Sequence, residues 1–237
     1  MAPLAAVNAA RWDKAKLTRN LKAVATNLVA NKPRYQTVSA KTGVPWFVIA
    51  VIHQRESSAN FSGVLHNGEA IIGTGRQTRL VPKGRGPFAT WGDAAVDALK
   101  NCHPYAAKNR DWSVGGTLAK LEEYNGLGYS RMGKPSPYIW AGTDQYVRGK
   151  YIADHVYDPN HVDTQPGCAA LIMTMMALDP TIAFGKKPVI PPAVTKATVP
   201  AAAAAGLAVW QYGLIGAAVV AAIAVGVFVY LKYFRKP

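Results

Sequence analysis

Acidic residues and cysteines are scarce in this chain. Its 237 residues include 13 Asp and Glu against 27 Lys and Arg, and the two cysteines are Cys102 and Cys168. Two cysteines far apart in sequence do not form a metal-binding motif, so we predict no metal site and no other cofactor. Their number leaves two states open, a disulfide in an oxidising compartment or two buried thiols.

Because acidic residues are few, the formal net charge is +14, and the excess of basic residues is spread along the chain. Residues 1–185 alone hold 21 basic residues and all 13 acidic ones. A basic surface suits nucleic acid, anionic lipid or an acidic cell-wall polymer. The chain contains no zinc-finger, RRM or basic-zipper pattern and no internal repeat, so nucleic acid is not the partner that we predict.

Residues 213–231 contain no charged residue, and 19 residues are just enough for a helix to cross a bilayer. Aromatic residues flank this segment as they do at membrane interfaces: Trp210 and Tyr212 before it, Tyr230 and Tyr233 at its end. Basic residues follow it: Lys232, Arg235 and Lys236. We therefore predict a single transmembrane helix in the lipid bilayer, with a cytoplasmic or interior C-terminal tail. The alternative is a buried core helix.

The pattern divides the chain into four parts. Residues 1–33 include apolar positions three and four apart from 6 to 31, which predicts one amphipathic helix. Residues 34–185 form the main domain, residues 186–205 a Pro/Ala-rich linker, and residues 206–237 the membrane helix and basic tail. Within the main domain we expect helices near 36–41, 45–57, 90–99, 113–124 and 169–178, a β-hairpin near 71–81 and an aromatic loop over 126–149. The fold class is α+β, mainly α.

Glu56 stands at the end of the apolar run 44–52, at the C-terminal end of a predicted helix. Burial beside apolar residues raises the pKa of a carboxyl group and suits it to proton donation near neutral pH. Glycosidic bond cleavage commonly pairs such an acid with a second carboxylate. Glu69, after the Asn67-Gly68 turn, is the candidate for that role. The alternative is that Glu56 is a helix-end residue paired with Arg55 or Lys41.

Three segments resemble phage and bacterial lysozyme-like muramidases. The first runs from Glu56-Ser57 through Asn60-Phe61 to the 65–69 segment Leu-His-Asn-Gly-Glu. The others are Tyr-Asn-Gly-Leu-Gly-Tyr at 124–129 and Ser-Pro-Tyr-Ile-Trp-Ala-Gly-Thr at 136–143. The resemblance covers about residues 34–160 and implies a lysozyme-like domain with Glu56 as general acid.

The substrate-binding candidates are five polar or aromatic residues: Ser57, Thr78, Tyr124, Asn125 and Tyr138. Each has a structural alternative. Threonine is common in exposed strands, Asn125 or Gly126 suits a helix C-cap, and Tyr138 suits a core.

The resemblance implies a membrane-tethered enzyme that cleaves peptidoglycan between N-acetylmuramic acid and N-acetylglucosamine, in phage lysis or cell-wall penetration. Residues 1–30 are interrupted by charges and are no secretory signal, so the membrane is either a host membrane, with the domain facing the periplasm or wall, or that of a virion. One alternative is a lytic transglycosylase that forms 1,6-anhydro products, although a Gly-Leu-Met-Gln segment is missing. Another is a non-catalytic wall-binding or structural virion protein. Glu69 also departs from the family pattern, which has Asp.

Overall fold

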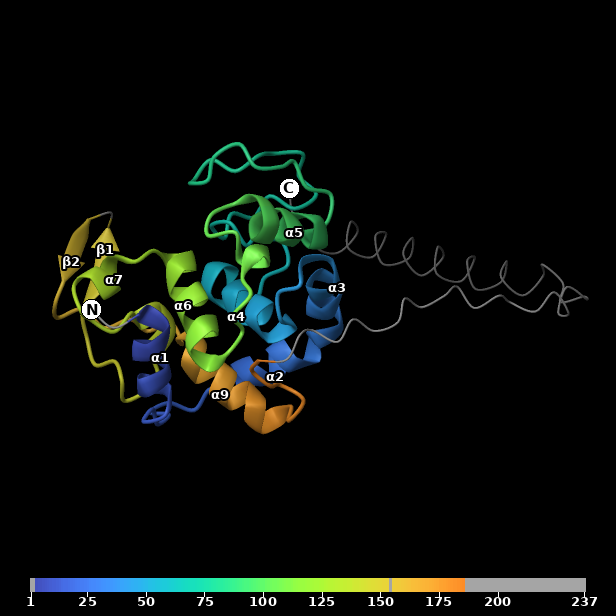
Figure 1. Ribbon diagram of the computed structural model, residues 1–237. Coiled ribbons are helices and arrows are strands. Elements are labelled where there is room, and N and C mark those ends of the chain that lie inside the picture. Colours follow the sequence, from blue (N-terminus) through green and yellow to red (C-terminus); the bar gives the residue numbers. More distant parts are fainter. Residues whose placement is uncertain (1–2, 154, 186–237) are drawn as a thin grey trace, which may run out of the picture. The chain divides into compact units, whose positions relative to one another are not determined.

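A helix that is apolar on all sides lies at the centre of the fold. This helix, α4 (Trp46–Ser57), begins after Pro45, and its residues from Phe47 to His53 are all buried. The computed structural model describes residues 3–153 and 155–185 (Figure 1). Four helices pack around α4: α2 (Lys22–Ala30), α3 (Lys32–Thr42), α6 (Val114–Asn125) and α9 (Cys168–Leu178).

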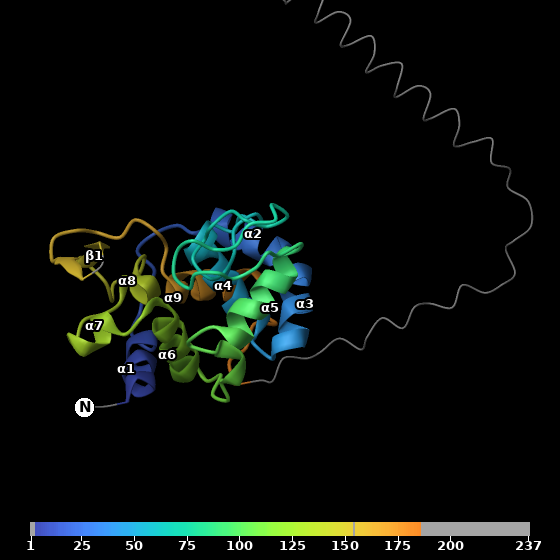
Figure 2. The same ribbon diagram turned by 90° about the horizontal axis from the view of Figure 1, so that it is seen from above.

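The outer elements attach to this centre. Helix α1 (Leu4–Trp12) packs along α6, and α5 (Trp91–Asn101) packs against α3, so the two lie on opposite sides of α4 (Figures 1 and 2). A 3₁₀ turn, η1 (Ala106–Lys108), follows α5, and the one-turn helices α7 (Gly128–Arg131) and α8 (Pro137–Trp140) follow α6. Strands β1 (Lys150–Ala153) and β2 (Val156–Asp158) form an antiparallel pair, with Lys150 opposite Asp158.

The mainly helical α+β class is confirmed. The helices predicted at 45–57, 90–99, 113–124 and 169–178 correspond to α4, α5, α6 and α9, and the piece predicted at 36–41 is part of the longer α3. The residues at 126–149 form a loop that contains α7 and α8. Strong apolar periodicity with clear end signals explains this agreement. For example, Thr90 caps α5 by accepting a hydrogen bond from the Asp93 N–H.

The prediction of one amphipathic helix over residues 6–31 is wrong. Helix α1 ends at Trp12 and α2 begins at Lys22. The residues between them instead bond to the segment after α8: the Thr18 N–H donates to the Gly142 carbonyl at 2.9 Å, and the Asp144 N–H donates to the Lys16 carbonyl at 3.0 Å. These contacts use main-chain groups that a continuous helix would bond internally.

The β-hairpin predicted at 71–81 is also wrong, and the two-stranded sheet lies at 150–158 instead. Residues 71–88 fold back as a loop, which projects beyond α5 in Figure 1. The Thr78 N–H donates to the Arg85 carbonyl at 2.9 Å, but Gly73 and Gly75 have φ of 71° and 72°. Left-handed glycines interrupt the pleat that a strand requires.

Cys102 and Cys168 are free thiols, and burial raises the pKa of Cys168 to about 12. The predicted membrane span at 213–231, its basic tail and the 186–205 linker lie outside the described residues. Among the helices at 3–153 and 155–185, none has the length and apolarity needed to cross a bilayer.

Candidate functional site

The Glu56 carboxyl group, at the end of α4, meets a side chain from α8. The Tyr138 hydroxyl donates a hydrogen bond to Glu56 Oε1 at 2.9 Å. Desolvation raises the pKa of Glu56 to about 7, although the Tyr138 hydrogen bond and the Arg55 charge act in the opposite direction. Burial and the nearby Glu56 charge raise the pKa of Tyr138 well above its ordinary value, so its phenol stays protonated and remains a donor.

Arg55 precedes Glu56 but does not pair with it. Its guanidinium bonds to Asp163 at 3.0 Å, and Lys150 bonds to the other carboxylate oxygen of Asp163 at 3.0 Å. The Arg55 guanidinium also lies over the Tyr138 ring, 4.7 Å from its centroid. Among residues 3–153 and 155–185, Glu56 forms no ion pair with Arg55 or with Lys41, so the alternative that predicted such a pair is wrong. Because Asp163 binds this cation, Glu56 has no ion pair within the described part of the chain that would lower its pKa strongly.

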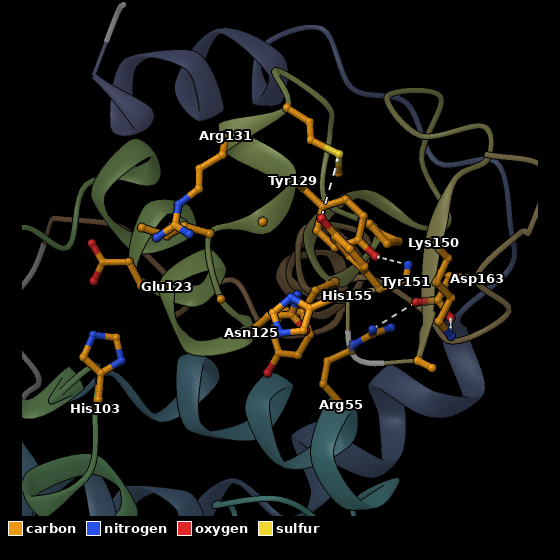
Figure 3. A pocket seen from close by; sticks show the side chains of 17 residues that line it. Arg55, His103, Glu123, Asn125, Tyr129, Arg131, Lys150, Tyr151, His155 and Asp163 are labelled. Atoms are coloured by element: carbon orange, nitrogen blue, oxygen red, sulfur yellow. Dashed lines mark hydrogen bonds and ion pairs between the residues drawn. The ribbon is translucent and has the colours of Figure 1, made fainter. Parts of the chain in front are cut away.

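A cavity of about 780 Å³ opens beside Tyr138 (Figure 3). It lies between the end of α4, helix α7 and the β1–β2 hairpin, and both Arg55 and Tyr138 line it. Glu56 is not among the residues that line the cavity, but it accepts the hydrogen bond of Tyr138, which does line it. The volume is within the roughly 300–1,000 Å³ that is typical of small-molecule sites.

Tyrosines from α7 and β1 build one wall of this cavity. Tyr129 and Tyr151 meet edge to face with ring centroids 5.2 Å apart, and the Tyr151 N–H donates to the Tyr129 hydroxyl at 2.9 Å. Gly128 lies beneath the Tyr151 ring, where a Cβ atom would be 3.0 Å from a ring carbon. Close packing of the hairpin on α7 therefore fixes the wall.

Glu69, the predicted second carboxylate, is bound by its own loop. Its side chain accepts hydrogen bonds from the Arg79 N–H, the Leu80 N–H and the Asn67 amide, at 2.9–3.0 Å. Partial burial alone would raise the pKa of Glu69, but these donors outweigh it and the pKa is lowered. Glu69 lines a small recess with Arg76 and Arg79 rather than the cavity beside Tyr138.

Two of the predicted substrate-binding residues make local structural bonds. The buried Thr78 hydroxyl donates to the Pro82 carbonyl and accepts from the Arg85 N–H at 2.9 Å. The Ser57 hydroxyl lies 3.2 Å from the His53 carbonyl and 3.3 Å from the Asn60 carbonyl. These contacts hold the 78–85 loop and the turn after α4.

The other predicted residues are closer to Glu56 or to the cavity. Asn125 is exposed and lines the cavity, while Gly126 is the C-cap of α6, with its N–H donating to the Glu123 carbonyl. The Tyr124 hydroxyl donates to the Leu65 carbonyl at 2.8 Å. Desolvation and the Glu56 charge raise the pKa of Tyr124. The structure thus groups Glu56 with Tyr124 and Tyr138, and it places Asn125 on the cavity wall.

Sequence reasoning did not single out Arg131, Lys150 and Asp163, although all three line the cavity. One sequence signal pointed to an acidic partner such as Asp163, and it did not extend to Arg131 or Lys150. Arg55 is a cation at the end of an otherwise apolar helix and needs an acidic partner when it is buried. Which acid supplies that partner depends on the tertiary fold, because Asp163 is more than one hundred residues away.

One other cluster, His66, Asp97 and Cys102, places a ligand atom from each residue within 4.8 Å of the others. Asp97 is already engaged, because the Arg85 guanidinium bonds to both of its oxygens and His66 Nε2 lies 2.9 Å from one of them. The arrangement is that of a paired structural carboxylate rather than a free metal ligand.

Comparisons of the chain with protein-family models, with curated proteins and with solved structures find no match.

Proposed function

We propose that this protein is a peptidoglycan-degrading enzyme of lysozyme-like fold, with Glu56 as the general acid. The observation that carries the proposal is the desolvated Glu56 carboxyl group, whose pKa is about 7, bonded to a tyrosine on the wall of a large cavity. A carboxyl group that is half protonated near neutral pH can protonate the bridging oxygen of a glycosidic bond. The tyrosines of the cavity wall suit stacking on sugar rings.

Tyr138 and Arg55 tune this acid. The Tyr138 phenol donates to Glu56 Oε1, which leaves Oε2 as the oxygen that delivers the proton. After transfer, the same phenol stabilises the carboxylate that forms. The Arg55 guanidinium pairs with Asp163 and lies over the Tyr138 ring, so it packs against Tyr138 without forming an ion pair with Glu56.

The bond to be cleaved is that between N-acetylmuramic acid and N-acetylglucosamine. A specific observation favours the lytic transglycosylase as second candidate: the Glu69 carboxylate accepts its hydrogen bonds from donors of its own loop. A muramidase needs a second group to activate water or stabilise the cation. Intramolecular attack by the C6 hydroxyl of muramic acid needs no second carboxylate: the Glu56 carboxylate left after protonation of the leaving oxygen takes the hydroxyl proton, and a 1,6-anhydro sugar is released.

The test is digestion of purified peptidoglycan by the full-length chain and by Glu56→Gln. We expect Glu56→Gln to lower the rate by about 10²-fold or more, as for loss of a general acid. Equal digestion by this variant, or none by the wild type, contradicts the proposal. The second outcome favours a non-catalytic wall-binding or virion protein.

Mass spectrometry of the released muropeptides separates the two reactions. Reducing ends in the wild-type digest, with a large loss of rate in Glu69→Gln, identify a muramidase. Anhydro ends, with Glu69→Gln retaining most of its activity, identify a transglycosylase.

A further inference from the structure

We propose that the cavity beside Tyr138 recognises carboxylates of the peptide stem that muramic acid carries. This inference rests on the proposed function and names the part of the substrate that occupies the cavity. The observation behind it is a difference in charge: the cavity lining has a net positive charge, while the glycan strand to be cleaved is uncharged.

The acidic residues among the described lining are already compensated. Asp163 is bound by two cations, Arg55 and Lys150, each at 3.0 Å. Glu123 forms an ion pair with Lys120, which lies outside the lining. Arg55, Lys150 and Asp163 together therefore carry one net positive charge on the cavity wall.

Arg131 adds a second positive charge. It is exposed, lines the cavity and makes no ion pair within the described part of the chain. In Figure 3 Arg131 lies on one side of the cavity and Lys150 on the other, with His155 between them. A guanidinium and an ammonium across one cavity suit a ligand with separated carboxylates.

In peptidoglycan the N-acetylated sugars are neutral, and the carboxylates belong to the peptide attached to the lactyl group of muramic acid. The same muramic acid carries the bond that Glu56 would protonate. A site for its peptide must therefore adjoin the acid, and this cavity does so through the hydrogen bond between Tyr138 and Glu56. At Gly126 in the lining, no atom lies within 4 Å of the position that a Cβ atom would take, which leaves room for a peptide backbone to approach.

The test is calorimetric titration of the full-length Glu56→Gln protein, which avoids turnover. The probes are the stem tetrapeptide L-Ala–γ-D-Glu–diaminopimelate–D-Ala and the neutral sugar chitotetraose. We expect Arg131→Gln, added to this background, to weaken tetrapeptide binding about tenfold and to leave chitotetraose binding unchanged, because only the peptide presents carboxylates.

The matched control is Arg110→Gln, since Arg110 is an exposed arginine outside the cavity lining. It should leave tetrapeptide affinity unchanged. Failure of the tetrapeptide to bind, or equal weakening by both arginine variants, overturns the inference. Displacement of the tetrapeptide by an equal concentration of inorganic phosphate also overturns it, because the cavity would then be a general anion site.

Turnover separates failure of this inference from failure of the proposed function. The wild-type chain should cleave intact peptidoglycan at least about tenfold faster than strands whose stems an amidase has removed, because each muramic acid then keeps only its lactyl carboxylate in place of the several carboxylates of the stem. Equal rates on both substrates refute peptide recognition and leave the enzyme intact. No cleavage of either refutes the proposed activity, whatever the tetrapeptide does.

Discussion

Glu56 and Glu69 are the same residue type on either side of one turn, and the fold gives them opposite properties. Glu56 ends a buried helix and receives one hydrogen bond, from Tyr138, and desolvation raises its pKa to about 7. Glu69 receives bonds from two main-chain N–H groups and an amide, which lower its pKa despite partial burial. The first is suited to hold a proton, and the second stays ionised.

The comparison shows that the number of donors directed at a carboxyl group affects its pKa as much as its burial among apolar residues does. Glu69 binds the main chain of Arg79 and Leu80, so its charge stabilises the loop at 67–80. Glu56 has no such structural task. Substitutions can test this contrast at three points, and the largest expected effect is at the place where the two regions touch.

Gly68 joins the regions, because a Cβ atom at this position would lie 2.1 Å from the main-chain oxygen of Glu56. Its φ of 79° is also left-handed. We expect Gly68→Ala to lower the free energy of unfolding by about 1 kcal/mol from backbone strain and by a further ~1–3 kcal/mol from the clash. Urea unfolding of the purified chain measures this loss.

Gly73→Ala is the matched control for Gly68→Ala. Gly73 has φ of 71°, but no atom lies within 4 Å of the position that a Cβ atom would take there, so only the cost of about 1 kcal/mol for backbone strain applies. Equal losses in the two variants would mean that the 67–80 loop moves freely away from Glu56. The close contact between Gly68 and the main chain of Glu56 would then contribute nothing to the free energy of unfolding.

The sequence predicted the helices well and the loop poorly, for a physical reason. The α4 run and the Thr90–Asp93 cap are local signals, and they located Glu56 at a helix end correctly. The 71–88 loop lacks such signals, because its shape depends on a carboxylate ten residues away that binds the Arg79 N–H. Tyr138 was predicted only as a substrate-binding residue, and its hydrogen bond to Glu56 was not foreseen. Asp163 was missed because its pairing with Arg55 is purely tertiary.

The second prediction concerns stability against pH, where the two glutamates should behave oppositely. The pKa of Glu56 rises from an ordinary 4.5 to about 7 on folding, so the folded state is penalised once this group ionises. The penalty is absent below pH 4.5, grows up to about pH 7 and is constant above it. Glu56→Gln removes it, so the stability gain of the variant over wild type should grow from zero near pH 4.5 to about 3 kcal/mol above about pH 7.

Glu69→Gln provides the opposite case. Because folding lowers the pKa of Glu69, its charge stabilises the protein above the unfolded-state pKa, and this contribution is lost as pH falls through the folded-state pKa. The variant should therefore be less stable than wild type at neutral pH and approach it in acid. Thermal unfolding across this pH range measures both variants. A parallel pH dependence in the two would show that their environments do not differ as described.

The smallest expected effect is a shift in the pH dependence of activity in Tyr138→Phe. In the function that we propose, the acid form of Glu56 is the active one, so activity should fall as pH rises through about 7. The Tyr138 hydrogen bond lowers the pKa of Glu56, and its removal should move this fall to higher pH. A bond worth about 0.5–1.5 kcal/mol corresponds to about 0.4–1.1 pH units.

Tyr124→Phe is the control for this shift, because the Tyr124 hydroxyl bonds to the Leu65 carbonyl rather than to Glu56. Rates of peptidoglycan digestion from mildly acidic to mildly alkaline pH compare the two variants with wild type. An unchanged profile in Tyr138→Phe would mean that desolvation alone sets the pKa of Glu56. Burial alone would then account for the raised pKa of Glu56, hydrogen bonds would account for the lowered pKa of Glu69, and the Tyr138 hydroxyl would have no measurable effect on Glu56.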